Sequence, residues 1–96
     1  MDLITLQREY REQILSIAEM CNSENIRVFG SVVRGEQRED SDIDFLVHMK
    51  PNSGLFDIGG LQWRLEELLH CKVDVVPDTC LHPRIKDRVL KEAIPL

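Results

Sequence analysis

The sequence predicts one α/β (α+β) domain in which helices flank a three-stranded mixed β-sheet. Apolar residues recur at helical spacing near both ends of the chain and in its middle. Three short runs rich in β-branched residues lie between these helical stretches. The chain has 96 residues, 43% of them hydrophobic, which is enough for one small core. We therefore expect residues 1–96 to form a single domain with the element order αβ(α)βαβα.

The first half of the chain predicts a helix, a strand and a helical turn. Residues 3–21 predict an amphipathic helix because their apolar residues fall three and four positions apart, and Asp2 can cap its start. Residues 26–29 are mostly β-branched or aromatic and predict a short strand. Residues 31–35 can form one helical turn, and a polar, charged loop follows as far as Ser41.

The second half predicts a strand, a helix, a strand and a final helix. Residues 42–48 carry four apolar side chains and predict a buried strand. Residues 57–69 predict a helix, and residues 71–76 predict a third strand that a proline ends. Residues 81–93 predict the last helix, with Pro95 as its stop. Three of its apolar residues are expected to face inward: Ile85, Val89 and Leu90.

Composition and charge exclude several classes of function. The net charge of −5 argues against general nucleic-acid binding, which depends on a basic surface. No stretch approaches the roughly 20 apolar residues of a membrane span, and the N-terminus is charged too early for a signal peptide. The three cysteines are odd in number and form no CxxC pair, so they are expected to be free thiols. We expect a cytoplasmic protein without membrane or direct nucleic-acid contacts.

Residues 28–47 contain a candidate phosphate-binding turn and a candidate metal-binding pair. The turn is Gly30-Ser31, which can present backbone N–H groups to a phosphate because glycine permits a close approach. Ten residues separate Ser31 from Asp42, and Asp44 follows two positions later. Carboxylates two positions apart on a strand point to the same face and can hold hard divalent cations. Phosphoryl-transfer chemistry needs such cations.

The turn and the carboxylate pair meet only if the first two strands run antiparallel. The helix at 57–69 is long enough for a right-handed crossover, so the second and third strands are expected to be parallel. Asp74, near the start of the third strand, then arrives at the same end of the sheet. Three carboxylates and a Gly-Ser turn should therefore converge on one edge.

The chain resembles the nucleotidyltransferase superfamily of the DNA polymerase β type. The resemblance covers nearly the whole chain and is closest to the minimal nucleotidyltransferase branch. Members of that branch often occur beside HEPN-domain proteins, as the antitoxin of a toxin–antitoxin pair. The residues that carry the resemblance are Gly30-Ser31, Arg34-Gly35, Asp42-Ile43-Asp44, the run from Lys72 to Val76 and the closing residues 92–96.

The resemblance implies a magnesium-dependent transfer of a nucleoside monophosphate, most naturally AMP from ATP. Asp42 and Asp44 would ligate two Mg²⁺ ions that carry the triphosphate. Asp74 would be the third carboxylate, near the attacking hydroxyl and able to act as its general base. Gly30 and Ser31 would hold the β- and γ-phosphates. The acceptor would be a tyrosine of a partner HEPN-type RNase toxin, which the chain would thereby silence within a hetero-oligomer.

Several residues, and the function of the chain as a whole, allow more than one interpretation from the sequence. Arg34 either reaches a phosphate or forms an ion pair with Glu36 or Asp40. Phe56 and Trp63 are expected in the core or at an interface rather than as a platform for a base. For the chain as a whole, one alternative is an antitoxin that neutralises its partner by complex formation alone. The other is a transferase for a small molecule such as an aminoglycoside.

Overall fold

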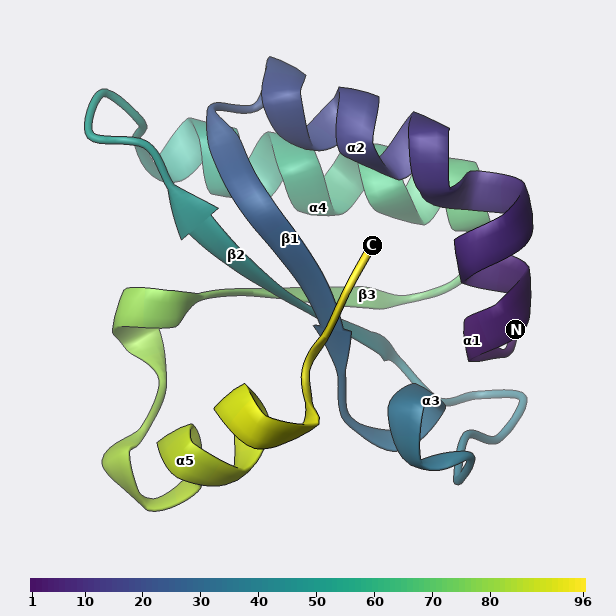
Figure 1. The fold of residues 1–96 in the computed structure, drawn as a ribbon. Coiled ribbons are helices and arrows are strands. Elements are labelled where there is room, and N and C mark those ends of the chain that lie inside the picture. Colours follow the sequence, from purple (N-terminus) through teal and green to yellow (C-terminus); the bar gives the residue numbers. More distant parts are fainter.

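The computed structural model describes residues 1–96 and contains a four-stranded mixed sheet with helices on both faces (Figure 1). The strands are β1 (Ser23–Phe29), β2 (Ile43–Met49), β3 (Val73–Pro77) and β4 (Ile94–Pro95), in the spatial order β3-β2-β1-β4. Strand β1 is antiparallel to β2 and to β4, whereas β2 is parallel to β3. The mixed sheet and the strand directions expected from the sequence are thereby confirmed.

The prediction of three strands was wrong by one, because the chain returns along β1 after its last helix. In the β1–β4 pair, Val28 lies opposite Ile94 and Arg27 lies opposite Pro95. A proline is compatible with this place because β4 is an edge strand, where a missing N–H donor need not break the ladder. The final residue, Leu96, is buried. The last five residues are therefore part of the folded domain.

The N-terminal helical region follows the sequence expectation closely. It comprises α1 (Leu3–Thr5), a π-helical segment η1 (Leu6–Tyr10) and α2 (Arg11–Met20). The Asp2 carboxylate accepts a hydrogen bond of 2.9 Å from the N–H of Thr5, which confirms the predicted cap. The π-helical segment was not expected, since a change of one residue per turn leaves no clear mark on the apolar spacing.

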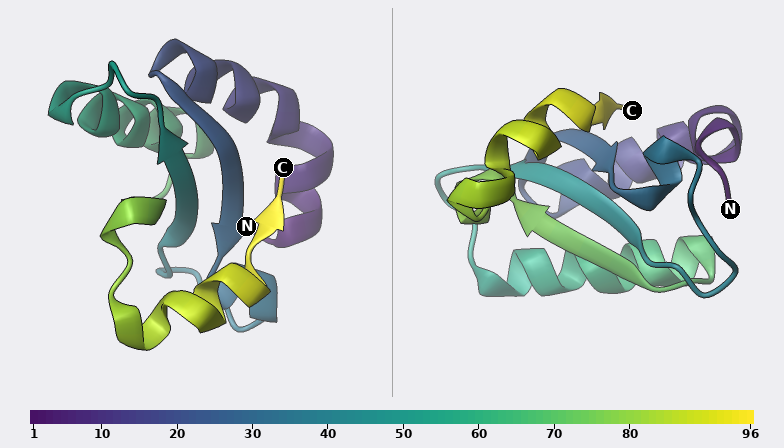
Figure 2. Two further views of the ribbon diagram at one scale, coloured as in Figure 1. Left: turned by 60° about the vertical axis from the view of Figure 1, so that its left-hand side comes forward. Right: turned by 90° about the horizontal axis from the view of Figure 1, so that it is seen from below.

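Of the remaining helices, the two longest lie on opposite faces of the sheet (Figure 2). They are α3 (Ser31–Arg34), α4 (Leu55–Leu69), the 3₁₀ turn η2 (Asp78–Cys80) and α5 (Pro83–Glu92). Helix α4 forms the right-handed connection between β2 and β3 and covers one face together with α2, whereas α5 lies on the other. None of these helices has the length and apolar character that a membrane crossing requires.

The inward-facing residues of α5 were predicted only in part. Val89 is buried, but Ile85 is 37% exposed and Leu90 is 40% exposed. Val89 packs with Leu46 and Leu81 in a small cluster that is separate from the main core. Because this second cluster is small, α5 rests on the sheet mainly through Val89 and leaves its flanking apolar residues in contact with solvent.

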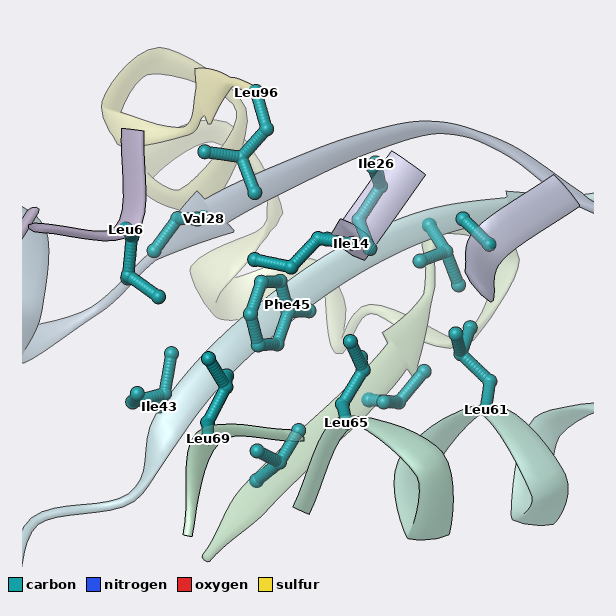
Figure 3. Close-up of a cluster of buried hydrophobic side chains, with 14 of the residues drawn as sticks. Leu6, Ile14, Ile26, Val28, Ile43, Phe45, Leu61, Leu65, Leu69 and Leu96 are labelled. Carbon is teal, nitrogen blue, oxygen red and sulfur yellow. The ribbon is translucent and has the colours of Figure 1, made fainter. Parts of the chain in front are cut away.

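The main core lies between the sheet and the α2–α4 layer (Figure 3). Phe45 is fully buried at its centre, near Ile14 of α2 and Leu65 of α4. Side chains alternate along a strand, so burial of Ile43 and Phe45 directs Asp44, which lies between them, to the opposite face. The hydrophobic pattern of β2 thus fixes the direction of a candidate site residue.

Candidate active site

The turn at Gly30 joins β1 to α3 and has a backbone conformation suited to glycine. Its φ is +82° and its ψ is −154°, a combination that other residues rarely adopt. The Gly30 carbonyl accepts hydrogen bonds from the N–H groups of Val33, at 3.1 Å, and Arg34, at 3.3 Å. One turn later Gly35 ends α3 with a φ of +72°. The helical turn predicted after the first strand is therefore present, with a glycine at each end.

Gly30 lies directly against the Asp44 side chain. The residue before it, Phe29, is the register partner of Asp44 across the antiparallel β1–β2 pair. A Cβ atom added to Gly30 would overlap the Asp44 Oδ2 atom and would lie 3.1 Å from its Cγ. Only a residue without a side chain leaves room for this carboxylate, so the turn and the carboxylate pair do meet as the sequence predicted.

The carboxylates of the predicted triad gather at the same end of the sheet. Asp44 and Asp74 are register partners in the parallel β2–β3 pair, and their side chains therefore emerge on one face. Asp42 lies immediately before β2, two positions from Asp44. Asp44 is half-buried, whereas Asp42 and Asp74 are exposed to solvent. The convergence follows from the strand directions that the sequence analysis anticipated.

Burial and two neighbouring carboxylates make Asp44 a weaker acid than a free aspartate. Burial, followed by the charges of Asp74 and Asp42, raises the pKa of Asp44 from 3.8 to about 6, while Arg34 acts in the opposite direction. A carboxylate with a raised pKa beside two others is an electrostatically costly arrangement. Such arrangements occur often at functional sites, where a ligand or an ion compensates for the charge.

The donor set is suited to a hard divalent cation. Carboxylate oxygens are the ligands that Mg²⁺ prefers, and a bound cation would offset both the burial of the Asp44 charge and its repulsion by Asp74 and Asp42. The space that a Cβ would fill at Gly30 keeps the Asp44 carboxylate beside the turn. No group of three His, Cys, Asp or Glu side chains has the spacing of a preformed metal site. The types of side chain thus suit a divalent cation, whereas the roles of these residues as metal ligands stay predictions.

The structure adds one residue that the sequence analysis did not select, Glu92 at the end of α5. Its Oε2 atom accepts a hydrogen bond of 2.8 Å from the Gly30 N–H. Its Oε1 atom accepts one of 2.6 Å from Nη1 of Arg34. Arg34 also donates from Nε to Glu36, at 3.0 Å, so the predicted ion pair with Glu36 is confirmed. The phosphate-binding role of Arg34 stays a prediction.

These contacts hold Glu92 in its charged form. Burial alone would raise the pKa of Glu92, but the hydrogen bonds from Arg34 and from the Gly30 N–H outweigh burial and lower it. The hydrogen bonds that Arg34 donates to Glu92 and to Glu36 raise the pKa of Arg34. Glu92 lies 62 residues from Gly30 along the chain, so no local spacing indicates the contact. The only signal was its place in the closing segment that carries the family resemblance.

A hollow of about 270 Å³ lies beside the acidic residues, between the loops that lead into β2 and β3. Its lining includes residues 39–41 and residues 70–72. Ser41 orients the first of these loops, because its hydroxyl accepts a hydrogen bond of 2.8 Å from the N–H of Arg38. The carboxylates of Asp42, Asp44 and Asp74 do not line this hollow, although Asp42 directly follows Ser41 in the chain.

Comparison with known proteins shows the family. The family model described as "Nucleotidyltransferase domain" matches residues 8–96. A provisionally named protein adenylyltransferase of Methanocaldococcus jannaschii is 40% identical over 86 residues, which are 90% of this chain and 92% of that protein. Protein adenylyltransferase MntA of Thermococcus cleftensis is 44% identical over 69 residues, or 72% of this chain and 70% of that one.

Solved structures share the fold. One that is described provisionally as a minimal nucleotidyltransferase is 48% identical to the chain, with a TM-score of 0.87 and coverage of 100% of this chain and 97% of that one. A toxin–antitoxin structure with AMP-PNP has a TM-score of 0.75 at 22% identity, covering 90% of this chain and 71% of that one. A complex of a tri-AMPylated Shewanella oneidensis HEPN toxin with an MNT antitoxin has a TM-score of 0.65 at 19% identity, with coverage of 88% and 66%. The last two show likeness of fold alone.

The match to the family covers the same residues that the structure brings together at one end of the sheet. The glycine turn after β1, the aspartates at the start of β2 and the aspartate on β3 occupy one corner of a mixed sheet. The match extends over nearly the whole chain. This chain is a nucleotidyltransferase and belongs to the nucleotidyltransferase domain family.

Proposed function

We propose that this chain transfers AMP from ATP, with magnesium, to a tyrosine hydroxyl of a partner HEPN-type RNase toxin and so acts as its antitoxin. The observation that carries the proposal is the contact between the glycine turn and the carboxylates. Gly30 lies against Asp44, whose register partner is Asp74. A phosphate-binding turn and metal-binding carboxylates must be neighbours when one ligand, a metal-bound nucleoside triphosphate, occupies both.

The proposed reaction assigns a separate task to each part of the site. Asp42, Asp44 and Asp74 would hold Mg²⁺, which would supply charge neutralisation for the triphosphate. The N–H and hydroxyl of Ser31, at the start of α3, would bind terminal phosphate oxygens. The acceptor oxygen would form a bond to the α-phosphorus while the bond to the bridging α–β oxygen breaks, and pyrophosphate would leave. Asp74 is exposed on an edge strand and would accept the proton of the incoming hydroxyl.

A protein acceptor is supported by the surface of the chain and by its relatives. Phe56 is 97% exposed and Trp63 is 60% exposed, both on α4, so neither belongs to the core. Large exposed apolar side chains are typical of protein contacts, which leaves the interface interpretation for these two residues. Two relatives are named as protein adenylyltransferases, and solved antitoxins of this fold occur with HEPN toxins.

The proposal is tested with the purified chain, its HEPN partner, ATP and magnesium. Mass spectrometry of the partner is expected to show added AMP on a tyrosine, and chelation of magnesium should abolish the addition. The double variant Asp42→Asn/Asp44→Asn should lose the transfer but still form the complex. Asp40→Asn is a matched control, because Asp40 is an exposed aspartate in the same loop and outside the proposed triad.

The same experiment separates catalysis from the alternatives. If the double variant still neutralises the toxin in cells, the chain acts by complex formation and the transfer is not its function. If the partner gains no nucleotide while a small hydroxylated molecule does, the acceptor has been assigned wrongly. Either result would remove the protein adenylyltransferase proposal.

A further inference from the structure

We propose that Glu92 is a positioning residue of the active site, which holds the Gly30-Ser31 turn and the Arg34 guanidinium in the arrangement that receives the triphosphate. The inference rests on the proposed function, because it assigns a role within the same nucleotide site. It concerns a contact made by the far end of the chain, from α5, with the turn after β1.

Glu92 bridges the two ends of α3 with one carboxylate. Its Oε2 atom binds the N–H of Gly30, immediately before the helix, and its Oε1 atom binds Arg34, the last helical residue. Helix α3 has only four residues, and an isolated single turn is not stable in water. Hydrogen bonds to a charged carboxylate are stronger than neutral ones, so this bridge is suited to hold the turn.

The Glu92 side chain is largely buried and belongs to a hydrogen-bonded part of the fold. Its side chain is 12% exposed. The next residue, Ala93, donates its N–H to the carbonyl of Val89 at 2.8 Å, and β4 follows at once and pairs with β1. Because Glu92 ends α5 and β4 closely follows it, the backbone at this residue is fixed on both sides. Its carboxylate can therefore define the position of the turn, which a carboxylate on a mobile tail could not do.

The bridge also separates Arg34 from the acidic residues of the site. Arg34 lies close enough to Asp44 to lower the pKa of that carboxyl group, but its hydrogen bonds are to Glu92 and Glu36. A guanidinium paired with the metal-binding carboxylates would exclude a cation from them. With Nη1 of Arg34 bound to Glu92, the guanidinium keeps further N–H donors that a phosphate can use.

Glu36 provides a natural comparison within the same structure. It also accepts a hydrogen bond from Arg34, at 3.0 Å, but its side chain is 64% exposed and it makes no contact with Gly30. An exposed pair of this kind contributes little to positioning. A substitution at Glu36 therefore perturbs Arg34 without removing the bridge across α3.

The test compares Glu92→Gln, Glu92→Ala and Glu36→Gln with the unchanged protein. Calorimetry with AMP-PNP and magnesium gives the dissociation constant, and AMP transfer to the HEPN partner gives KM and kcat. Glu92→Ala is expected to raise both the dissociation constant and the KM for ATP by about tenfold or more, in line with the loss of a charge-assisted hydrogen bond. Glu92→Gln keeps one acceptor oxygen, so its dissociation constant and KM should lie between those of the unchanged protein and of Glu92→Ala. Glu36→Gln should change the dissociation constant and KM by less than about twofold.

Amide hydrogen exchange supplies a readout that needs no nucleotide. Residues 31–34 are expected to exchange faster in both Glu92 variants, while the amides of β2 and β3 stay protected. Tighter AMP-PNP binding by Glu92→Gln would show instead that Glu92 competes with the triphosphate, and would overturn the positioning role. Unchanged binding by both Glu92 variants would overturn it as well. A wild-type chain that binds no AMP-PNP would overturn the proposed function, and this inference with it.

Discussion

Asp44→Asn is expected to stabilise the free protein even though it removes a proposed metal ligand. Burial and the charges of Asp74 and Asp42 raise the pKa of Asp44 from 3.8 to about 6. A raised pKa means that the folded state disfavours the charged carboxylate relative to the unfolded chain. Asparagine has nearly the same shape and carries no charge, so the substitution removes this cost.

The rise in pKa sets the size of the effect. At about 1.4 kcal/mol for each pKa unit, the full shift corresponds to roughly 3 kcal/mol. Asp44 is half-buried, and partial exposure screens the interaction, so we expect the free energy of unfolding to increase by about 1–2 kcal/mol. For a chain of this length such a gain raises Tm by about 5–15 °C.

The effect must depend on pH with a definite sign. Above about pH 6, Asp44 is ionised in the folded and unfolded states, and the folded state bears the whole cost. As the pH falls from about 6 towards 3.8, the folded state binds the proton first, so the cost disappears. The advantage of Asp44→Asn should therefore be largest near pH 8 and shrink as the pH approaches 4. Glu92, whose pKa is lowered, is the same in both proteins and cancels in the difference.

Urea unfolding followed by circular dichroism, with a chelator present, measures this difference at a series of pH values. Asp40→Asn serves as the control, because Asp40 is exposed and should show no such gain. Magnesium should then stabilise the unchanged protein more than the variant, since the cation relieves the same repulsion. A variant that is no more stable than the unchanged protein at pH 8, or whose advantage is independent of pH, would refute the reasoning.

Two further predictions concern the turn and the C-terminal segment. Gly30→Ala should lower the free energy of unfolding by about 3 kcal/mol, because the φ of Gly30 is +82° and an added Cβ would overlap the Asp44 carboxylate. Gly35→Ala should lower it by only about 1 kcal/mol, because the φ of Gly35 is +72° but an added Cβ would meet no neighbouring atom. Chemical denaturation of both variants checks the ratio, and equal costs would contradict the close contact. Leu96→Ala should cost about 2 kcal/mol because Leu96 is 9% exposed, whereas Leu90→Ala, at 40% exposure, should cost less than half as much. Equal Tm values for these two variants would show that the last residue is not part of the core.

The arrangement of the three long strands could be predicted from the sequence because the chemistry of the site restricts the topology. Asp44 and the Gly30 turn can meet only across an antiparallel pair, and the helix before β3 imposes the parallel pair that brings Asp74 to the same end. The structure shows both pairings. Both pairings involve segments that are long enough to show a hydrophobic period or to form a crossover.

The parts that escaped prediction lack such a local signal. Strand β4 has two residues, which is too short to show an alternating pattern, and a proline in it resembled a helix stop. Glu92 is 58 residues from Arg34 and belongs to a helix whose charged residues mostly face solvent. Ile85 was misplaced because helical spacing predicts a face but not how much of that face the sheet covers.

Gly30 is the point where the two halves of the site meet, and this explains why they can be altered separately. Its N–H is held by Glu92, the last residue of α5, while its Cα lies against the carboxylate of Asp44 of β2. These two carboxylates therefore act on the turn from different elements, Glu92 from the end of α5 and Asp44 from β2. Loss of Glu92 should therefore loosen the phosphate-binding turn while β2 and β3 keep their register and their carboxylates. Loss of the Asp44 charge should leave α3 bridged but weaken cation binding. Nucleotide affinity with and without magnesium distinguishes these two defects.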